Sequence, residues 1–125
     1  MFKLDKDDKT TFLITRGDKG SFSVKKRISD NVYEPFYKGD VVTFSVKSNF
    51  ASSDVLLRKK VIVPENTDMV TFNLTKEDTS IGDLISDPIT YQYDIAINDD
   101  ITILGYDDKT GPKSLILYPE GSNDE

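Results

Sequence analysis

Apolar and polar residues alternate over short runs along most of the chain. The clearest run spans residues 41–47, where every second position is apolar and the positions between are mostly polar. Because successive side chains of a β-strand point to opposite faces of a sheet, this spacing predicts a strand with one buried face. The longest run, at residues 89–97, predicts a central strand by the same reasoning. We expect Phe44 and Tyr93, in the middle of these runs, to lie in the core.

Further short runs predict most of the remaining strands, with turn-forming residues between them. These runs cover residues 11–15, 21–24, 55–63, 69–74, 101–106 and 114–118. The strands follow one another about every 8 to 15 residues, and no repeated helical pattern could carry parallel crossovers. We therefore predict an all-β fold, an immunoglobulin-like antiparallel β-sandwich of about seven to eight strands. We expect residues 1–125 to form one domain, with a core at about 11–118 and a loose acidic tail at 119–125.

One segment departs from this alternation and predicts a short helical turn. Residues 75–78 read Thr-Lys-Glu-Asp, which is similar to a capping box with Asp in the place of Glu. Ile81, Leu84 and Ile85 follow at helical spacing. Gly82 is too central for a long helix, so we predict one or two helical turns at most.

Composition and charge narrow the classes of function. The chain holds 22 acidic and 16 basic residues, for a net charge of −6. An acidic surface repels nucleic-acid phosphates and anionic lipid headgroups, so we expect neither nucleic acid nor a membrane as a partner. The absence of His and Cys removes the usual general base near neutral pH, the commonest transition-metal ligand and the thiol nucleophile. The sequence therefore predicts no enzyme, no cofactor, no metal site and no small-molecule substrate.

Arg58, Lys59 and Lys60 lie in the middle of a predicted strand. Edge strands are commonly defended by Lys, so three consecutive charges predict an edge strand with at least one solvated face. We consider these residues candidates for partner contact, because a basic patch on an acidic chain would steer and orient an acidic subunit. A solvated edge that resists aggregation is the alternative interpretation. The second basic cluster, Lys25-Lys26-Arg27, is open to the same two interpretations.

Three other patterns have a functional and a structural interpretation. Arg16-Gly17-Asp18 spells the integrin-binding tripeptide, yet turns need Gly and Asp for backbone reasons alone. Acidic pairs could hold Ca²⁺ between loops, but none has the calcium-loop spacing, so we expect solvated turns at residues 7–8, 99–100 and 107–108. Tyrosines in strands could form a sugar-binding platform but are more often part of the core; they are Tyr91, Tyr93, Tyr106 and Tyr118.

Five segments carry a resemblance to a known family. They are Arg-Gly-Asp at 16–18, the turn and strand at 38–47, the capped segment at 74–83, the alternating run at 89–95, and the closing segment at 115–121. Together they resemble a group of small virion proteins from tailed bacteriophages of Firmicutes. The pattern is similar to the immunoglobulin-like N-terminal domain of phage upper baseplate proteins, and it extends over nearly the whole chain.

The resemblance implies a structural component of the virion. Such a module acts on a tail, baseplate, neck or capsid through contacts with other virion proteins, self-assembling in many copies. Upper baseplate proteins usually continue into a helical, receptor-facing region, so the position on the particle stays open. A host-surface or carbohydrate-binding immunoglobulin-like adhesive module is the alternative, and a phage-encoded cytosolic inhibitor is a third possibility. A structural role predicts broad contact areas, whereas a lectin-like role predicts a compact groove with exposed aromatic residues.

Overall fold

The strands of this protein are short and numerous. A computed structural model describes residues 1–29, 31–49, 51–52, 54–105 and 111–120, and it contains eleven strands and one helical turn in these residues. In chain order the elements are β1 (Phe2–Leu4), β2 (Phe12–Thr15), β3 (Gly20–Val24), β4 (Lys26–Ser29), β5 (Val32–Glu34), β6 (Val41–Lys47), β7 (Val55–Ile62), β8 (Val70–Leu74), α1 (Lys76–Thr79), β9 (Ile89–Ile97), β10 (Ile101–Leu104) and β11 (Lys113–Tyr118). The predicted all-β class is confirmed, with more strands than expected.

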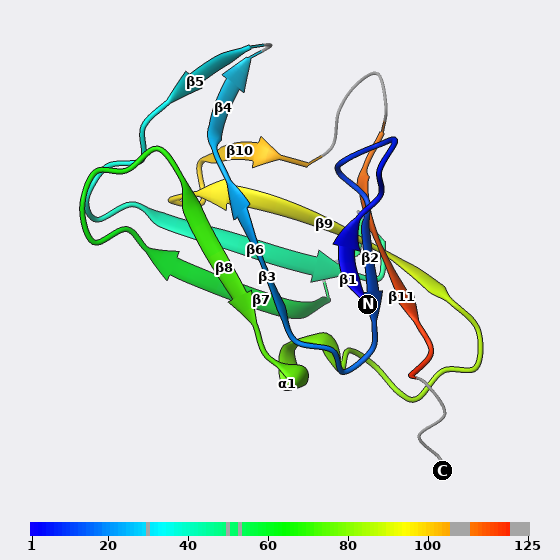
Figure 1. The fold of residues 1–125 in the computed structure, drawn as a ribbon. Coiled ribbons are helices and arrows are strands. Elements are labelled where there is room, and N and C mark those ends of the chain that lie inside the picture. The colour runs from blue at the N-terminus through cyan, green and yellow to red at the C-terminus, as the bar shows by residue number, and fades with distance from the viewer. Residues whose placement is uncertain (30, 50, 53, 106–110, 121–125) are drawn as a thin grey trace.

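Most of the strands join one open sheet (Figure 1). Its order is β1-β2-β11-β9-β6-β7, and β10 also pairs with β9. β11 pairs with residues 89–93 of β9 and β10 pairs with residues 95–97, so they share one edge of β9 in succession. β6 occupies the other edge of β9. The longest alternating run is therefore the central strand of the main sheet, as predicted.

The main sheet is mixed, which corrects the antiparallel prediction. β2 and β11 run parallel, with Phe12 opposite Leu115 and Thr15 opposite Tyr118. The other described pairs of this sheet are antiparallel. Alternation of apolar residues looks the same in either strand direction, so the pattern could not predict this pairing. The direction follows from the path of the chain, which brings β11 back alongside β2.

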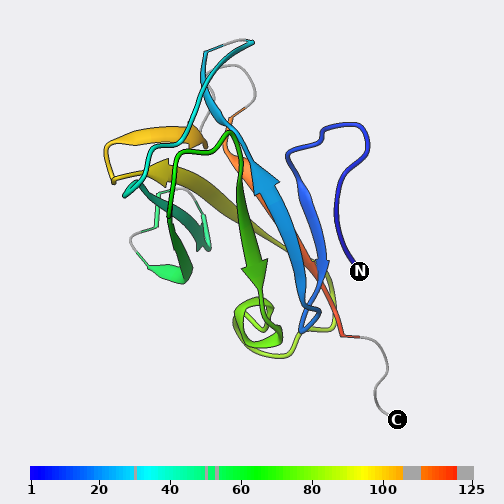
Figure 2. The same ribbon diagram turned by 60° about the vertical axis from the view of Figure 1, so that its left-hand side comes forward.

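The two-stranded sheet β3–β8 packs over the main sheet (Figures 1 and 2). Phe22 and Phe72 lie opposite each other in this small sheet, and their rings stack with centroids 5.2 Å apart. The ring of Phe22 also meets Phe12 at 4.7 Å and Phe44 at 5.1 Å. Tyr93 lies 5.1 Å from Phe12 and 5.5 Å from Phe44, again between centroids. These rings join the two layers, and such pairs add stability beyond their burial.

β4 and β5 form a separate hairpin that projects beyond both layers (Figures 1 and 2). Lys26 lies at its base and is only 7% exposed. Its ammonium group is 3.8 Å from the Glu34 carboxylate and 5.1 Å from the centroid of the Tyr37 ring. Lys26 thus has a structural role, whereas its neighbours Lys25 and Arg27 are exposed.

The predicted capping box is present at the start of α1. Thr75 Oγ1 accepts a hydrogen bond from the backbone N–H of Asp78 at 3.1 Å, and Asp78 Oδ2 accepts one from the N–H of Thr75 at 2.9 Å. These bonds satisfy backbone donors that the first turn of a helix leaves without partners. The predicted helical turn is therefore confirmed.

The helix does not continue through the apolar residues that follow it. It ends at Thr79, and Gly82 has a φ of +66°, which a right-handed helix cannot contain. Ile81 is buried at 6% exposure, whereas Leu84 is 77% exposed. The helical spacing of Ile81 and Leu84 therefore does not place them on one buried helix face.

Candidate functional site

Strand β7 carries the three basic residues that we expected to contact a partner. It stands at the end of the sheet order, which confirms the predicted edge position. Alternation along the strand divides the three residues between two faces. Arg58 and Lys60 are exposed on the outer face, whereas Lys59 is half-buried and lies opposite Phe44 on the inner face. The structure therefore brings only two of the three onto one surface.

Lys59 takes part in an internal ion pair. Its Nζ lies 2.8 Å from Asp78 Oδ2, the oxygen that also accepts the N–H of Thr75. Burial raises the pKa of the Asp78 carboxyl, but the hydrogen bond and charge of Lys59 and the hydrogen bonds from Thr75 outweigh burial and hold this pKa below its ordinary value. Lys59 thus joins β7 to the start of α1.

Replacing Asp78 by Asn should make the stability of the protein less sensitive to acid. A carboxyl with a lowered pKa in the folded state stabilises the fold above its unfolded pKa of about 3.9, and this contribution is lost as the pH falls through the folded pKa. We expect Asp78→Asn to lower the free energy of unfolding by about 1 kcal/mol near neutral pH. The difference from the wild type should shrink below about pH 4.

Urea unfolding at a series of pH values measures this effect. Asp83→Asn is the matched control, because Asp83 is exposed in the loop that follows α1. A difference between the wild type and Asp78→Asn that stays constant down to about pH 2 would show that the carboxylate charge does not matter.

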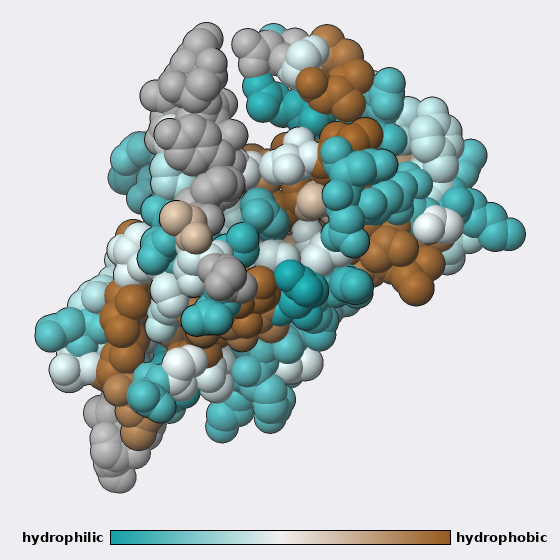
Figure 3. All heavy atoms as spheres, turned by 180° about the vertical axis from the view of Figure 1, so that it is seen from behind, coloured by the Kyte–Doolittle hydropathy of each residue, from teal (hydrophilic) through white to brown (hydrophobic). Residues whose placement is uncertain are grey.

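The outward-facing residues of β7 are all exposed, and we call the surface that they form the β7 face. Its residues alternate with the inward ones and are Leu56, Arg58, Lys60 and Ile62. Leu56 is 40% exposed and Ile62 is 68% exposed. Figure 3 views the molecule from behind and shows separate apolar areas among hydrophilic ones. Within the described residues, no strand pairs with the second edge of β7, so its backbone groups can accept another chain.

Asp94 lies beside the β7 face, and sequence reasoning did not single it out. It stands opposite Ser45 on the outer face of the sheet, in a hollow of about 180 Å³ that Lys47 and Arg58 also line. Burial raises the pKa of the Asp94 carboxyl, although the charges of Lys47 and Arg58 oppose the rise. The alternation of β9 could have identified Asp94, because a polar residue between inward-facing apolar residues of a strand lies on the outer face of the sheet.

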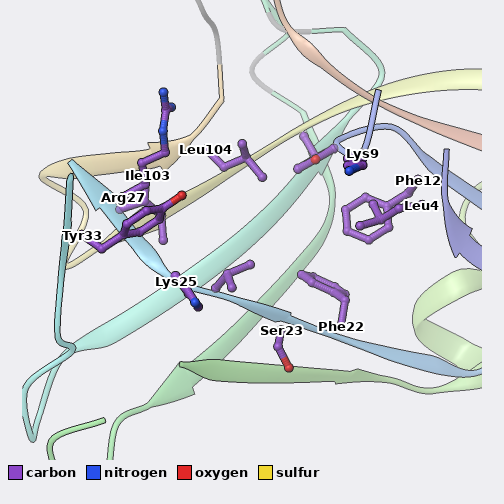
Figure 4. A pocket seen from close by; sticks show the side chains of 12 residues that line it. Leu4, Lys9, Phe12, Phe22, Ser23, Lys25, Arg27, Tyr33, Ile103 and Leu104 are labelled. Carbon is purple, nitrogen blue, oxygen red and sulfur yellow. The ribbon is translucent and has the colours of Figure 1, made fainter. Parts of the chain in front are cut away.

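A second candidate site is an apolar pocket of about 280 Å³ between the two layers (Figure 4). Its apolar lining comes from the main sheet, including β10, and from β3 of the small sheet, and includes Phe12, Phe22, Val24, Tyr93, Ile103 and Leu104. The Tyr93 hydroxyl donates a hydrogen bond to the backbone oxygen of Thr10. Burial, together with the negative charge of Asp8, raises the pKa of this hydroxyl well above its usual range. Tyr93 therefore remains a neutral, structural part of the pocket wall.

The rim of this pocket is basic. Lys9, Lys25 and Arg27 line it together with the exposed ring of Tyr33 (Figure 4). The ammonium group of Lys25 lies 5.8 Å from the centroid of the Tyr33 ring. An apolar interior with cations at its mouth suits an apolar group that carries negative charge beside it. The rim residues come from the β1–β2 connection and from the β3–β5 region, so their proximity could not be predicted from sequence spacing.

Arg16-Gly17-Asp18 is part of the fold. Arg16 Nη1 donates to Glu120 Oε1 at 2.6 Å. Arg16 Nε and Nη2 donate to the backbone oxygens of residues 80–82 at 2.7 to 3.2 Å. Gly17 has a φ of +87°, which the turn requires, and the backbone oxygen of Asp18 accepts a hydrogen bond from Thr79 Oγ1 at 2.9 Å. These contacts confirm the structural interpretation of the tripeptide.

The acidic pairs within the described residues lie in turns. Hydrogen bonds from Thr10 and Thr11 hold the pKa of the Asp8 carboxyl below its ordinary value. Asp99 and Asp100 follow β9 in the turn toward β10. Asp107-Asp108 lies outside the described residues. In the described ranges, no group of three or more His, Cys, Asp or Glu side chains is placed to hold a metal ion.

Of the four tyrosines considered for a sugar-binding platform, the three that the structure describes do not form an exposed aromatic surface. Tyr91 and Tyr93 are 8% and 2% exposed, which confirms the core interpretation for these two residues. Tyr118 is half-buried, and Tyr106 lies outside the described residues.

The described part of the chain contains no helix long and apolar enough to cross a bilayer.

Both candidate sites are surfaces suited to contact, one basic and solvated and the other apolar with a basic rim. Comparisons of the chain with models of protein families, with curated proteins and with solved structures found no match.

Proposed function

We propose that this protein is a structural component of a tailed-bacteriophage virion that acts through protein–protein contacts. Its place is on a tail, baseplate, neck or capsid, among other virion proteins and further copies of itself. We also propose that its two packed β-layers are a variant of the immunoglobulin-like sandwich. The resemblance of five segments to small virion proteins motivates the proposal, and the β7 face is the observation that supports it.

The chemistry of the β7 face favours an acidic partner surface. An antiparallel pair of two β7 strands centred on Lys59 would place Arg58 of each copy opposite Lys60 of the other. Like charges directly opposite each other destabilise a strand pair, so the edge disfavours its own copy in that register. An acidic surface would instead gain complementary charges, with Leu56 and Ile62 adding apolar contact at the two ends of the strand.

The adhesive alternative has less support. A lectin-like module needs aromatic side chains that are free to stack on a sugar, and the rings of Tyr91 and Tyr93 are packed inside the protein instead. The exposed rings of Tyr33 and Tyr37 each already have a lysine ammonium group over one face. We therefore retain the structural role as the proposed function.

Reversing both charges of the β7 face should impair incorporation into particles. We expect Arg58→Glu together with Lys60→Glu to lower the copy number per particle by about tenfold, which corresponds to about 1.4 kcal/mol of lost contact energy. Lys59 is left unchanged because its ion pair with Asp78 supports the fold. Quantitative mass spectrometry of purified virions measures the copy number.

Lys3→Glu together with Lys19→Glu is the matched control, because it changes the net charge equally at two exposed positions away from β7, with Lys3 on β1 at the opposite end of the sheet order. Incorporation of the β7 variant at the wild-type copy number would make the β7 face a solvated edge only. Absence of the wild-type protein from purified particles would overturn the proposed function itself.

A further inference from the structure

Leu84 is an exposed aliphatic side chain in a loop that the rest of the protein holds in place. It is 77% exposed, whereas its neighbour Ile85 packs against the core. Arg16 donates hydrogen bonds to the backbone oxygens of residues 80–82, just before Leu84. A large apolar side chain presented from a fixed loop is a feature of contact surfaces, because binding then costs little ordering of the loop.

Acidic residues flank this side chain. Asp83 and Asp87 are both exposed in the same loop. The loop therefore presents an apolar group with carboxylates on either side of it in sequence. This is the chemistry that suits the pocket described above, whose interior is apolar and whose rim carries Lys9 and Lys25.

The loop and the pocket lie at opposite ends of the molecule. The loop follows α1 at the lower end in Figures 1 and 2. The pocket lies toward the other end, where β10 and the β4–β5 hairpin are found. The pocket of a chain is therefore remote from its own Leu84 but accessible to the Leu84 of a second copy.

We propose that Leu84 of one copy inserts into the apolar pocket of a second copy, with Asp83 and Asp87 facing the basic rim. This inference deepens the proposed function and rests on it, since it supplies a contact between repeated copies in a particle. Among the aliphatic side chains that the structure describes, Ile62 is the next most exposed after Leu84, at 68%. Its basic neighbour Lys60 would meet the basic rim, so charge favours Leu84.

A contact between opposite ends is heterologous, so it repeats head to tail. Such contacts generate rings when the rotation between copies closes and open filaments when it does not. A single inserted side chain makes a small contact, well below the roughly 800 Å² per partner of a standard stable interface. We therefore expect the contact to be weak between free molecules and to become effective where many copies are held together.

Cysteine cross-linking tests this contact directly, because the chain has no Cys of its own. Leu4 lines the pocket and is 42% exposed, so Leu4→Cys introduces a thiol there without emptying the core. We expect oxidation of a mixture of L4C and L84C proteins to give at least about tenfold more mixed disulfide dimer than L4C with I62C, the matched control. A single protein with both L4C and L84C should form a regular ladder of oligomers. Circular dichroism verifies that each variant keeps the fold.

Charge reversal supplies a second test of the same contact. Asp83→Lys with Asp87→Lys in the L84C protein should reduce the cross-link by about tenfold, and Lys9→Glu with Lys25→Glu in the L4C protein should restore it. Restoration is the outcome that a merely structural effect of the substitutions would not produce.

Equal cross-linking with L84C and I62C would overturn the proposal. Titration with decanoate, followed by nuclear magnetic resonance of the pocket residues, tests the other occupant of matching chemistry. Saturable decanoate binding without preferential L84C cross-linking would assign the pocket to a small anionic amphiphile instead. If the protein is present in virions but the cross-link does not form, only this inference is contradicted. If the protein is absent from virions, the proposed function is contradicted.

Discussion

Replacing Phe44 by Ala should lower the free energy of unfolding by about 3–5 kcal/mol, an effect that we expect only Tyr93→Ala to match. Phe44 is 0% exposed, and its ring contacts those of Phe12, Phe22, Phe72 and Tyr93. Truncation to Ala removes buried apolar surface and leaves a cavity where the small sheet packs on the main sheet. Tyr93→Ala should cost about as much, since its ring occupies the same cluster.

Urea unfolding monitored by circular dichroism measures both losses. Tyr33→Ala is the matched control, because this aromatic residue is 54% exposed and should cost no more than about 0.5 kcal/mol. A loss below about 1 kcal/mol for Phe44→Ala would mean that the two β-layers are not joined through this ring.

Replacing Arg16 by Ala should lower the free energy of unfolding by about 2–4 kcal/mol. The Arg16 side chain is only 11% exposed and pairs with Glu120. Its remaining hydrogen bonds reach three backbone oxygens of residues 80–82. Removal leaves these acceptors and the carboxylate without their donor, and hydrogen bonds to charged groups are among the stronger ones in proteins.

Arg16→Lys distinguishes geometry from charge in this cluster. Lys keeps the positive charge but lacks the planar fork of donors, so we expect it to recover less than about half of the loss. Lys19→Ala, at a neighbouring exposed position, should change stability by no more than about 0.5 kcal/mol. Wild-type stability of Arg16→Ala in thermal and urea unfolding would show that the carbonyl contacts contribute nothing.

The sequence by itself determined the features that depend on neighbouring residues. Alternation at residues 41–47 and 89–97 identified two strands and the inward position of Phe44 and Tyr93, because strand geometry places every second side chain on one face. The Thr75–Asp78 capping box predicted the start of α1, because its hydrogen bonds are local. Consecutive charges in β7 indicated an edge strand, because they cannot be buried on both faces.

The alternation in β7 also indicated that Arg58, Lys59 and Lys60 do not all face the same side, although we predicted one patch from all three. Neighbouring strand residues point to opposite faces, so Lys59 could not share a surface with Arg58 and Lys60. Its contact with Asp78 could not be predicted, because the two residues are brought together by packing of separate elements.

Only the tertiary structure decided the features that depend on distant segments. The parallel pairing of β2 with β11 depends on the path of the chain, which alternation does not encode. The hydrogen-bond partners of Arg16 lie 64 to 104 residues away in the sequence. The tripeptide alone therefore could not predict that Arg16 holds the loop at residues 80–82. Leu84 and the basic-rimmed pocket likewise became recognisable only after folding, because exposure and cavity shape are properties of packed elements rather than of sequence spacing.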